Sequence, residues 1–103
     1  MVEIDHPKTG QPLSLEAGRA FIENVILPTL ARAEQLAKQG RIIAGGPVAG
    51  RIALRFIAEV ESPQSLDRLI SGLPLWPISD TRVTPLVDFT ERRAQVELLL
   101  QDR

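Results

Sequence analysis

The chain has 103 residues, of which 44% are apolar and 24% are charged, and its formal net charge is −1. These values predict one folded, soluble domain over residues 1–103, and the balanced charge gives no reason to expect nucleic acid or an anionic membrane as a partner. The absence of cysteine excludes disulfides, thiolate nucleophiles and sulfur-ligated metals.

The start of the chain has no basic segment followed by a long apolar run, and no stretch of about 18 apolar residues occurs anywhere. We therefore expect neither a secretory signal nor a membrane span, and a cytoplasmic location. Apolar Val2 and Ile4 alternate with polar neighbours, which predicts a half-buried strand over residues 1–6. Residues 6–12 are rich in proline and glycine and predict a loop.

A long helix follows over residues 15–39, where apolar side chains recur three or four positions apart. Ser14 is the expected N-cap, and Gly40 is the expected terminator. Pro28 lacks a backbone N–H and clashes with the preceding turn, so we expect a kink or break near Leu27.

Two strands are predicted over residues 41–48 and 51–61. The first runs into a Gly45-Gly46-Pro47 stretch, which suits a turn or bulge; a loop that holds a phosphate or carboxylate is the alternative, although no known phosphate-binding motif surrounds it. The second strand has one fully apolar face, made of Ile52, Leu54, Phe56, Ala58 and Val60.

The next helix begins at Ser62 as N-cap and Pro63 as its first residue, and it ends at Gly72. A fourth strand is predicted over residues 81–87, with its internal proline tolerated at an edge or bulge. Thr90 is the expected cap of a final helix.

This order of elements is that of the α+β ferredoxin-like plait, βαββαβ, with a C-terminal helix added. One sheet carries both main helices on one face, and its other face stays bare. The residues expected on the bare face are Arg51, Arg55, Ile57 and Glu59. Two such sheets packed face to face would enclose a partly polar cavity, and the apolar final helix would support that association or fold back on its own sheet.

The segment Leu73-Pro74-Leu75-Trp76-Pro77, followed by Val83-Thr84-Pro85-Leu86, resembles the muconolactone isomerase family. Further matches lie at Gln39-Gly40 and at Phe56-Ile57-Ala58-Glu59-Val60-Glu61-Ser62, so the resemblance covers about residues 30 to 87. Ala44-Gly45-Gly46-Pro47 is similar to the YCII-like relatives in the same dimeric α/β-barrel group.

The resemblance implies a dimeric α/β barrel, assembled as a homodimer or as a multimer of dimers. It also implies an acid/base isomerase of aromatic catabolism that moves a proton within a small unsaturated lactone, without a cofactor. The family carries tyrosine or other polar groups along the third strand, whereas this chain has no tyrosine and places Ile52 and Leu54 there. A non-catalytic ligand-binding or assembly protein on the same fold is therefore the alternative function.

Few side chains are available for acid/base chemistry, because the chain has a single histidine. We expect the base to be Glu59 or His6, and Arg55 or Arg51 to offer positive charge to a carboxylate or an enolate. The alternative for Arg55 and Glu59 is a structural ion pair, cross-strand or on the same face, at a dimer seam, and the alternative for His6 is a solvated side chain.

The remaining candidate residues are expected to bind the substrate. Ile57 lies on the bare face, Trp76 can form a pocket wall or a subunit contact, and Asp80 is a site carboxylate or a turn residue. No metal site is expected, because one histidine and no cysteine cannot supply the usual catalytic ligand set without carboxylates.

Overall fold

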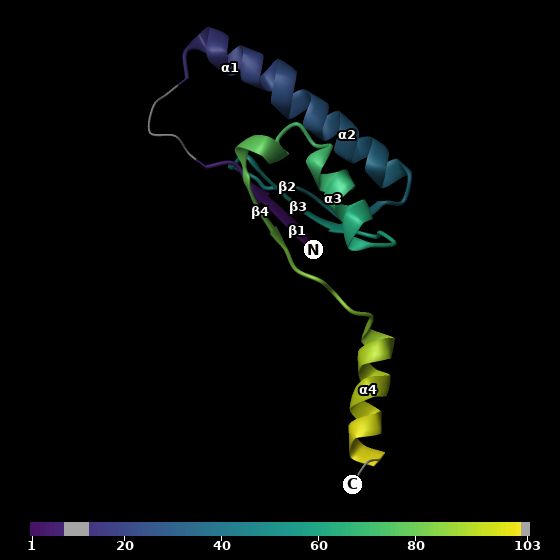
Figure 1. Ribbon diagram of the computed structural model, residues 1–103. Helices are drawn as coiled ribbons and strands as arrows, with labels where there is room; N and C mark the ends of the chain where they lie inside the picture. The colour runs from purple at the N-terminus through teal and green to yellow at the C-terminus, as the bar shows by residue number, and fades with distance from the viewer. Residues whose placement is uncertain (8–12, 102–103) are drawn as a thin grey trace.

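The computed structural model describes residues 1–7 and 13–101. The strands are β1 (Val2–Asp5), β2 (Ile42–Pro47), β3 (Ala53–Ala58) and β4 (Asp80–Val83), all paired antiparallel in the order β2-β3-β1-β4. The helices are α1 (Leu15–Phe21), a π turn η1 (Ile22–Ile26), α2 (Leu27–Lys38), α3 (Pro63–Ser71), a 3₁₀ turn η2 (Trp76–Ile78) and α4 (Phe89–Gln101) (Figure 1). The predicted ferredoxin-like plait is confirmed; the predicted loop over residues 8–12 lies outside the described residues.

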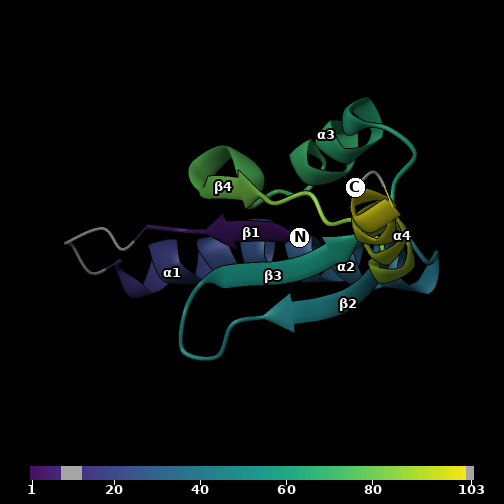
Figure 2. The same ribbon diagram turned by 90° about the horizontal axis from the view of Figure 1, so that it is seen from below.

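The core lies between the sheet and the helices. Val2 and Ile4 of β1 pair with Phe56 and Leu54 of β3, and all four side chains are buried on the helix-facing side. They pack with buried residues of α2, α3 and the segment that follows α3, namely Leu36, Leu69, Ile70, Leu73 and Leu75. The other face of the sheet carries no helix of the plait (Figure 2).

The long first helix begins as predicted, because the Ser14 hydroxyl accepts a hydrogen bond from the Ala17 N–H at 3.1 Å. Its expected break takes the form of the π turn η1, in which the Leu27 N–H donates to the Ile22 carbonyl five residues back. This wider turn lies just before Pro28, whose ring clashes with the carbonyl four residues earlier in a regular α-helix. The chain therefore continues as a helix instead of breaking.

Several predicted boundaries are wrong, including the end of the third strand, which is Ala58 and not residue 61. The third strand begins at Ala53, so Ile52 lies in the preceding turn and is 44% exposed. The fourth strand ends at Val83, before the proline that cannot donate to a ladder. The cap of α4 is Asp88, whose carboxylate accepts from the Thr90 N–H at 2.7 Å, so Thr90 lies inside the helix.

The final helix α4 stands away from the plait (Figure 1). None of its described residues is buried, and its side chains at Phe89 and Leu100 are 95% and 74% exposed. The described chain measures 66 Å along its longest axis and 30 and 23 Å along the others. The alternative in which this helix folds back on its own sheet is therefore wrong.

Candidate functional site

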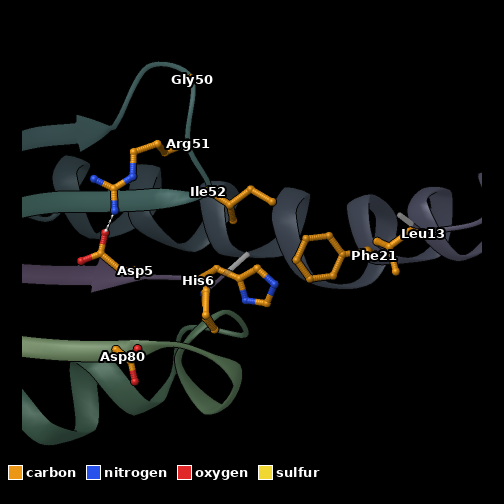
Figure 3. Close-up of a pocket in the computed structure, with 9 residues that line it drawn as sticks. Asp5, His6, Leu13, Phe21, Gly50, Arg51, Ile52 and Asp80 are labelled. Carbon is orange, nitrogen blue, oxygen red and sulfur yellow. Dashed lines mark hydrogen bonds and ion pairs between the residues drawn. The ribbon is translucent and has the colours of Figure 1, made fainter. Parts of the chain in front are cut away.

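A cleft of about 740 Å³ opens at the end of the sheet where β1 finishes and β3 begins (Figure 3). Its walls, within the described part of the chain, are Asp5, His6, Pro7, Leu13, Phe21, Gly50, Arg51, Ile52 and Asp80. Aromatic and aliphatic groups of α1 and the β3 turn form one side, and charged groups at the strand ends form the other. Such a cleft suits a small molecule with an apolar body and a charged or polar end.

His6 is fixed in this cleft by both its backbone and its ring. Its N–H donates to the Ile52 carbonyl at 3.0 Å, which continues the pairing of β1 with β3 beyond Asp5. The ring Nδ1 lies 3.0 Å from the Ile78 carbonyl oxygen. Because a carbonyl oxygen only accepts hydrogen bonds, Nδ1 carries the hydrogen, and Nε2 of the neutral ring keeps a free lone pair.

The aromatic wall beside His6 is Phe21, the last residue of α1. The two ring centroids are 5.2 Å apart and the planes are inclined by 34°. Figure 3 shows the imidazole between Phe21 and the strand ends, with Ile52 alongside. The imidazole of the half-buried His6 therefore has an apolar wall on one side.

A tight turn brings Arg51 to the rim of the cleft. Gly50 adopts φ +77°, a left-handed conformation that side chains disfavour. The Val48 N–H donates to the Ala53 carbonyl at 2.9 Å, which closes the turn between β2 and β3. Glycine at this position thus directs Arg51 back towards the end of β1.

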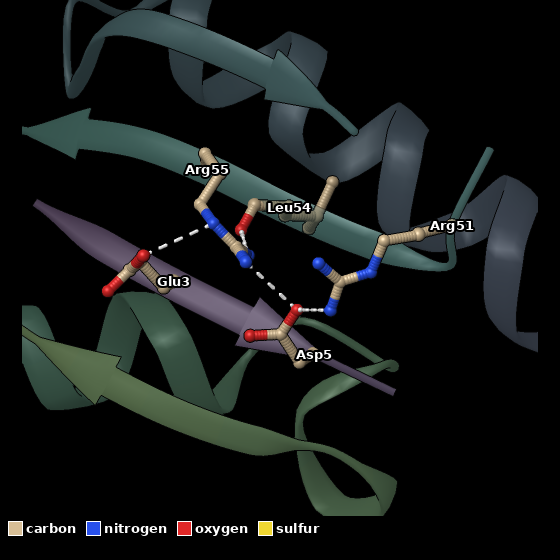
Figure 4. A network of polar contacts seen from close by, with 5 residues as sticks. All are labelled: Glu3, Asp5, Arg51, Leu54 and Arg55. Carbon is tan, nitrogen blue, oxygen red and sulfur yellow. Dashed lines mark hydrogen bonds and ion pairs between the residues drawn. The ribbon is translucent and has the colours of Figure 1, made fainter. Parts of the chain in front are cut away.

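The bare face of the sheet carries an ion-pair network next to the cleft (Figure 4). The Asp5 carboxylate oxygen Oδ1 accepts from Arg51 at 2.7 Å and from Arg55 at 3.0 Å, and Arg55 also lies 3.3 Å from the Glu3 carboxylate. Arg55 donates in addition to the carbonyl of Leu54 at 2.9 Å. The guanidinium of Arg55 is thus held on three sides, whereas the Arg51 side chain is 55% exposed and can reach a ligand.

Strand β4 adds charges to the same face. Arg82 lies directly opposite Glu3, and Asp80 lies directly opposite Asp5. Like charges at directly opposed positions repel, and the two arginines on Asp5 offset that repulsion. A second hollow of about 330 Å³ runs along this face and is lined by Glu3, Asp5, Arg55, Asp80, Thr81 and Arg82.

The structure gathers some of the predicted site residues and separates others. His6, Arg51 and Asp80 line the cleft, and Arg55 joins them through Asp5. Glu59 follows the far end of β3, where its N–H donates to a backbone carbonyl and its side chain is exposed. The roles assigned to all these residues stay predictions.

The other two predicted residues also lie away from the cleft. Ile57 faces the bare side of the sheet, where it pairs with Ala44 of β2. Trp76 lies in η2, is 37% exposed and is outside the set of described residues that line the cleft. Neither position suits direct contact with a ligand held at His6 within one copy of the chain.

Asp5, Phe21 and Ile52 are cleft residues that the sequence did not single out. For Asp5 the signal was present, because strand alternation that buries Val2 and Ile4 must turn Asp5 to the bare face. Phe21 and Ile52 read as ordinary core positions, since periodicity does not tell where a helix or strand extends past its partner.

Two classes of site find no support in the described residues. The described residues contain no group of three or more histidine, cysteine or acidic side chains placed to hold a metal ion. Over the same residues, no helix has the length and apolar character needed to cross a bilayer.

The fold and the cleft define a small α+β domain of the ferredoxin-like kind with a polar site at the end of its sheet. The family model described as muconolactone delta-isomerase matches residues 14–92, from the cap of α1 into α4. The chain therefore belongs to the muconolactone delta-isomerase family. No curated protein matches the sequence.

Proposed function

We propose that the chain is a cofactor-free isomerase that moves a proton within a small unsaturated lactone or a related acid, as expected from its family. The observation that carries the proposal is the hydrogen bond from His6 Nδ1 to the Ile78 carbonyl, which leaves a basic nitrogen in a partly apolar cleft beside Arg51. A place for the reaction in aromatic catabolism and a cytoplasmic location belong to the same proposal.

In the proposed reaction, His6 Nε2 removes a proton from the carbon next to the lactone carbonyl. The electron pair of the broken C–H bond forms a new C=C bond, and negative charge develops on the carbonyl oxygen. The imidazolium then returns the proton to another carbon of the conjugated system. The double bond is shifted, no atom is gained or lost, and His6 regains its neutral form.

Arg51 supplies the positive charge that this reaction needs. Its exposed guanidinium lies at the rim of the cleft, and its bond to the Asp5 carboxylate at 2.7 Å fixes its direction. A guanidinium aimed at the developing enolate oxygen lowers the barrier electrostatically. Arg55 orients Asp5 from the other side, and Asp80 offers an acceptor for a hydroxyl or a protonated group of the ligand.

Ligand binding without turnover is the second candidate function, favoured by the absence of tyrosine from the chain. A cavity filled by Ile52 and Leu54 would favour it further. In the structure, however, Leu54 is buried in the core and Ile52 forms one wall of a cleft that stays open.

The test of the proposed function is turnover of small unsaturated lactones, with and without a carboxylate, followed by proton NMR in D₂O. We expect at least one lactone to isomerise and take up deuterium faster than in buffer, with the carboxylate-bearing compounds preferred because of Arg51. Ligand-induced shifts of the His6 ring signals without any deuterium uptake would identify a binding protein and refute the isomerase.

We also propose that the chain forms a homodimer, or a larger assembly of such dimers, in which α4 packs on a second copy. Helices of fewer than about 12–15 residues are marginal in water unless an apolar face is packed. α4 has 13 residues, no buried side chain and an exposed stripe that contains Phe89, Val96 and Leu100. The bare sheet face carries Ile57 together with the acidic and basic side chains of the charge network. It therefore offers the second copy an apolar contact and charges of both signs.

Charging the stripe of α4 tests this assembly. Val96→Glu combined with Leu100→Glu should convert the dimer into a monomer in light-scattering measurements of molar mass, because the stripe then resists burial. The matched control is Gln95→Glu with Gln101→Glu, which adds the same charge away from the stripe and should leave the molar mass unchanged. A monomeric parent chain, or two indistinguishable variants, would rule out this role of α4.

A further inference from the structure

Thr29 of α2 is the one polar residue in the described part of the chain that is buried as a whole, at 2% exposed. Its hydroxyl oxygen accepts a hydrogen bond from the Leu75 N–H at 3.0 Å. The two residues are 46 positions apart in the sequence, so the bond ties α2 to the segment that follows α3. A buried backbone N–H needs such a partner, and here a side chain provides it.

Leu75 is the residue on which η2 is built. The Trp76 N–H donates to the Leu73 carbonyl at 2.9 Å, and the Ile78 N–H reaches the Leu75 carbonyl at 3.4 Å. Pro77 has no N–H of its own, so few hydrogen bonds define this turn. The Thr29 hydroxyl therefore fixes the start of η2, and the carbonyl at its end, that of Ile78, accepts from His6.

We infer that Thr29 is a positioning residue for His6: through Leu75 and η2 it places the Ile78 carbonyl so that the histidine ring carries its hydrogen on Nδ1 and presents a bare Nε2 to the cleft. The tautomer of a neutral histidine is set by the partner of its other nitrogen. Displacement of η2 removes that partner and frees the ring to carry its hydrogen on either nitrogen. The use of Nε2 as a base rests on the proposed function, whereas the tautomer does not.

The chain has one histidine, so the imidazole signals in nitrogen-15 NMR of the labelled protein come from His6 alone. Spectra are recorded at pH about 9, where an ordinary imidazole is neutral. In the parent chain we expect Nδ1 to show the shift of a protonated ring nitrogen and Nε2 that of an unprotonated one. In Thr29→Val, which keeps the shape but loses the acceptor, the two shifts should move towards a common value.

Two variants separate this effect from a loss of stability. Thr29→Ser keeps the hydroxyl and should retain the parent shifts, and Leu69→Ala weakens the core elsewhere and should also retain them. If Thr29→Val does not fold, Thr29→Ala makes the same comparison. Amide exchange at Leu75 should be faster in the valine variant and unchanged in the serine variant.

A hydrogen on Nε2 in the parent chain, or unchanged shifts in the folded valine or alanine variant, would overturn the inference. These readouts need no substrate. A chain with the expected tautomer and no lactone turnover would thus refute the proposed function and leave the role of Thr29 standing. A chain with turnover but the opposite tautomer would refute the role of Thr29 and the use of Nε2 as the base, and would leave the isomerase activity standing.

Discussion

Replacing His6 with glutamine should lower the rate of lactone isomerisation by about 10²- to 10⁴-fold, the usual contribution of a positioned general base. Glutamine is similar in size to histidine and keeps an N–H donor, but its amide cannot take up a proton. The variant should therefore fold and bind ligand as the parent does. The measurement is the initial rate of deuterium uptake by the preferred lactone.

The matched control for His6→Gln is Glu59→Gln, because Glu59 is the other base that the sequence offers. Its side chain is exposed beyond the end of β3, away from the cleft at the start of that strand. We expect its rate to stay within about twofold of the parent, since exposed substitutions far from a site have small effects. A large loss in Glu59→Gln with little change in His6→Gln would transfer the role of base to Glu59.

Gly45→Ala should destabilise the fold by about 3 kcal/mol or more, through a steric clash added to backbone strain. A methyl group on Gly45 would lie 2.1 Å from the Arg55 carbonyl oxygen and 2.5 Å from the Phe56 Cα. The residue also has φ +123°, a region that alanine rarely adopts. Because backbone atoms form the obstacle, β2 must move away from β3 to relieve it.

Gly46→Ala provides the matched control one residue further along β2. Nothing lies within 4 Å of the added methyl group, and φ at Gly46 is not positive. The free energy of unfolding in urea should change by less than about 0.5 kcal/mol for Gly46→Ala. Equal unfolding midpoints for the two variants would show that the close approach at Gly45 is not required. Gly45→Ala should also disturb the ion pairs of Arg55, whose carbonyl lies in the path of the clash.

Local sequence signals predicted the fold wherever one residue type decides a local geometry. Ser62 caps α3, accepting from the Ser65 N–H at 3.1 Å, and Pro63 follows at the first helical position. Alternation placed Leu54 and Phe56 in the core and Arg55 on the bare face. Boundaries failed where neighbours compete, as at Asp88, whose carboxylate caps α4 ahead of Thr90.

The candidate site was predictable only in part, because its contacts join distant segments. His6 was a candidate by residue type alone, but its bond to Ile78 spans 72 positions and has no local signature. Likewise, nothing in a pattern of period 3.6 reveals that Phe21 extends past the sheet to line the cleft beside His6. Arg51 was selected for its charge, whereas its aim depends on the left-handed turn at Gly50.

The π turn η1 fixes the rotation between two functional stretches of the first helix. Phe21, beside the cleft, precedes it, and Thr29, bonded to Leu75, follows it. Each residue of an α-helix advances the chain by about 100° around the axis. Deletion of one residue here would remove the wide turn that accommodates Pro28, and with Thr29 still anchored the phenyl ring would turn away from the imidazole. The spacing between the two positions is therefore as much a part of the site as the side chains themselves.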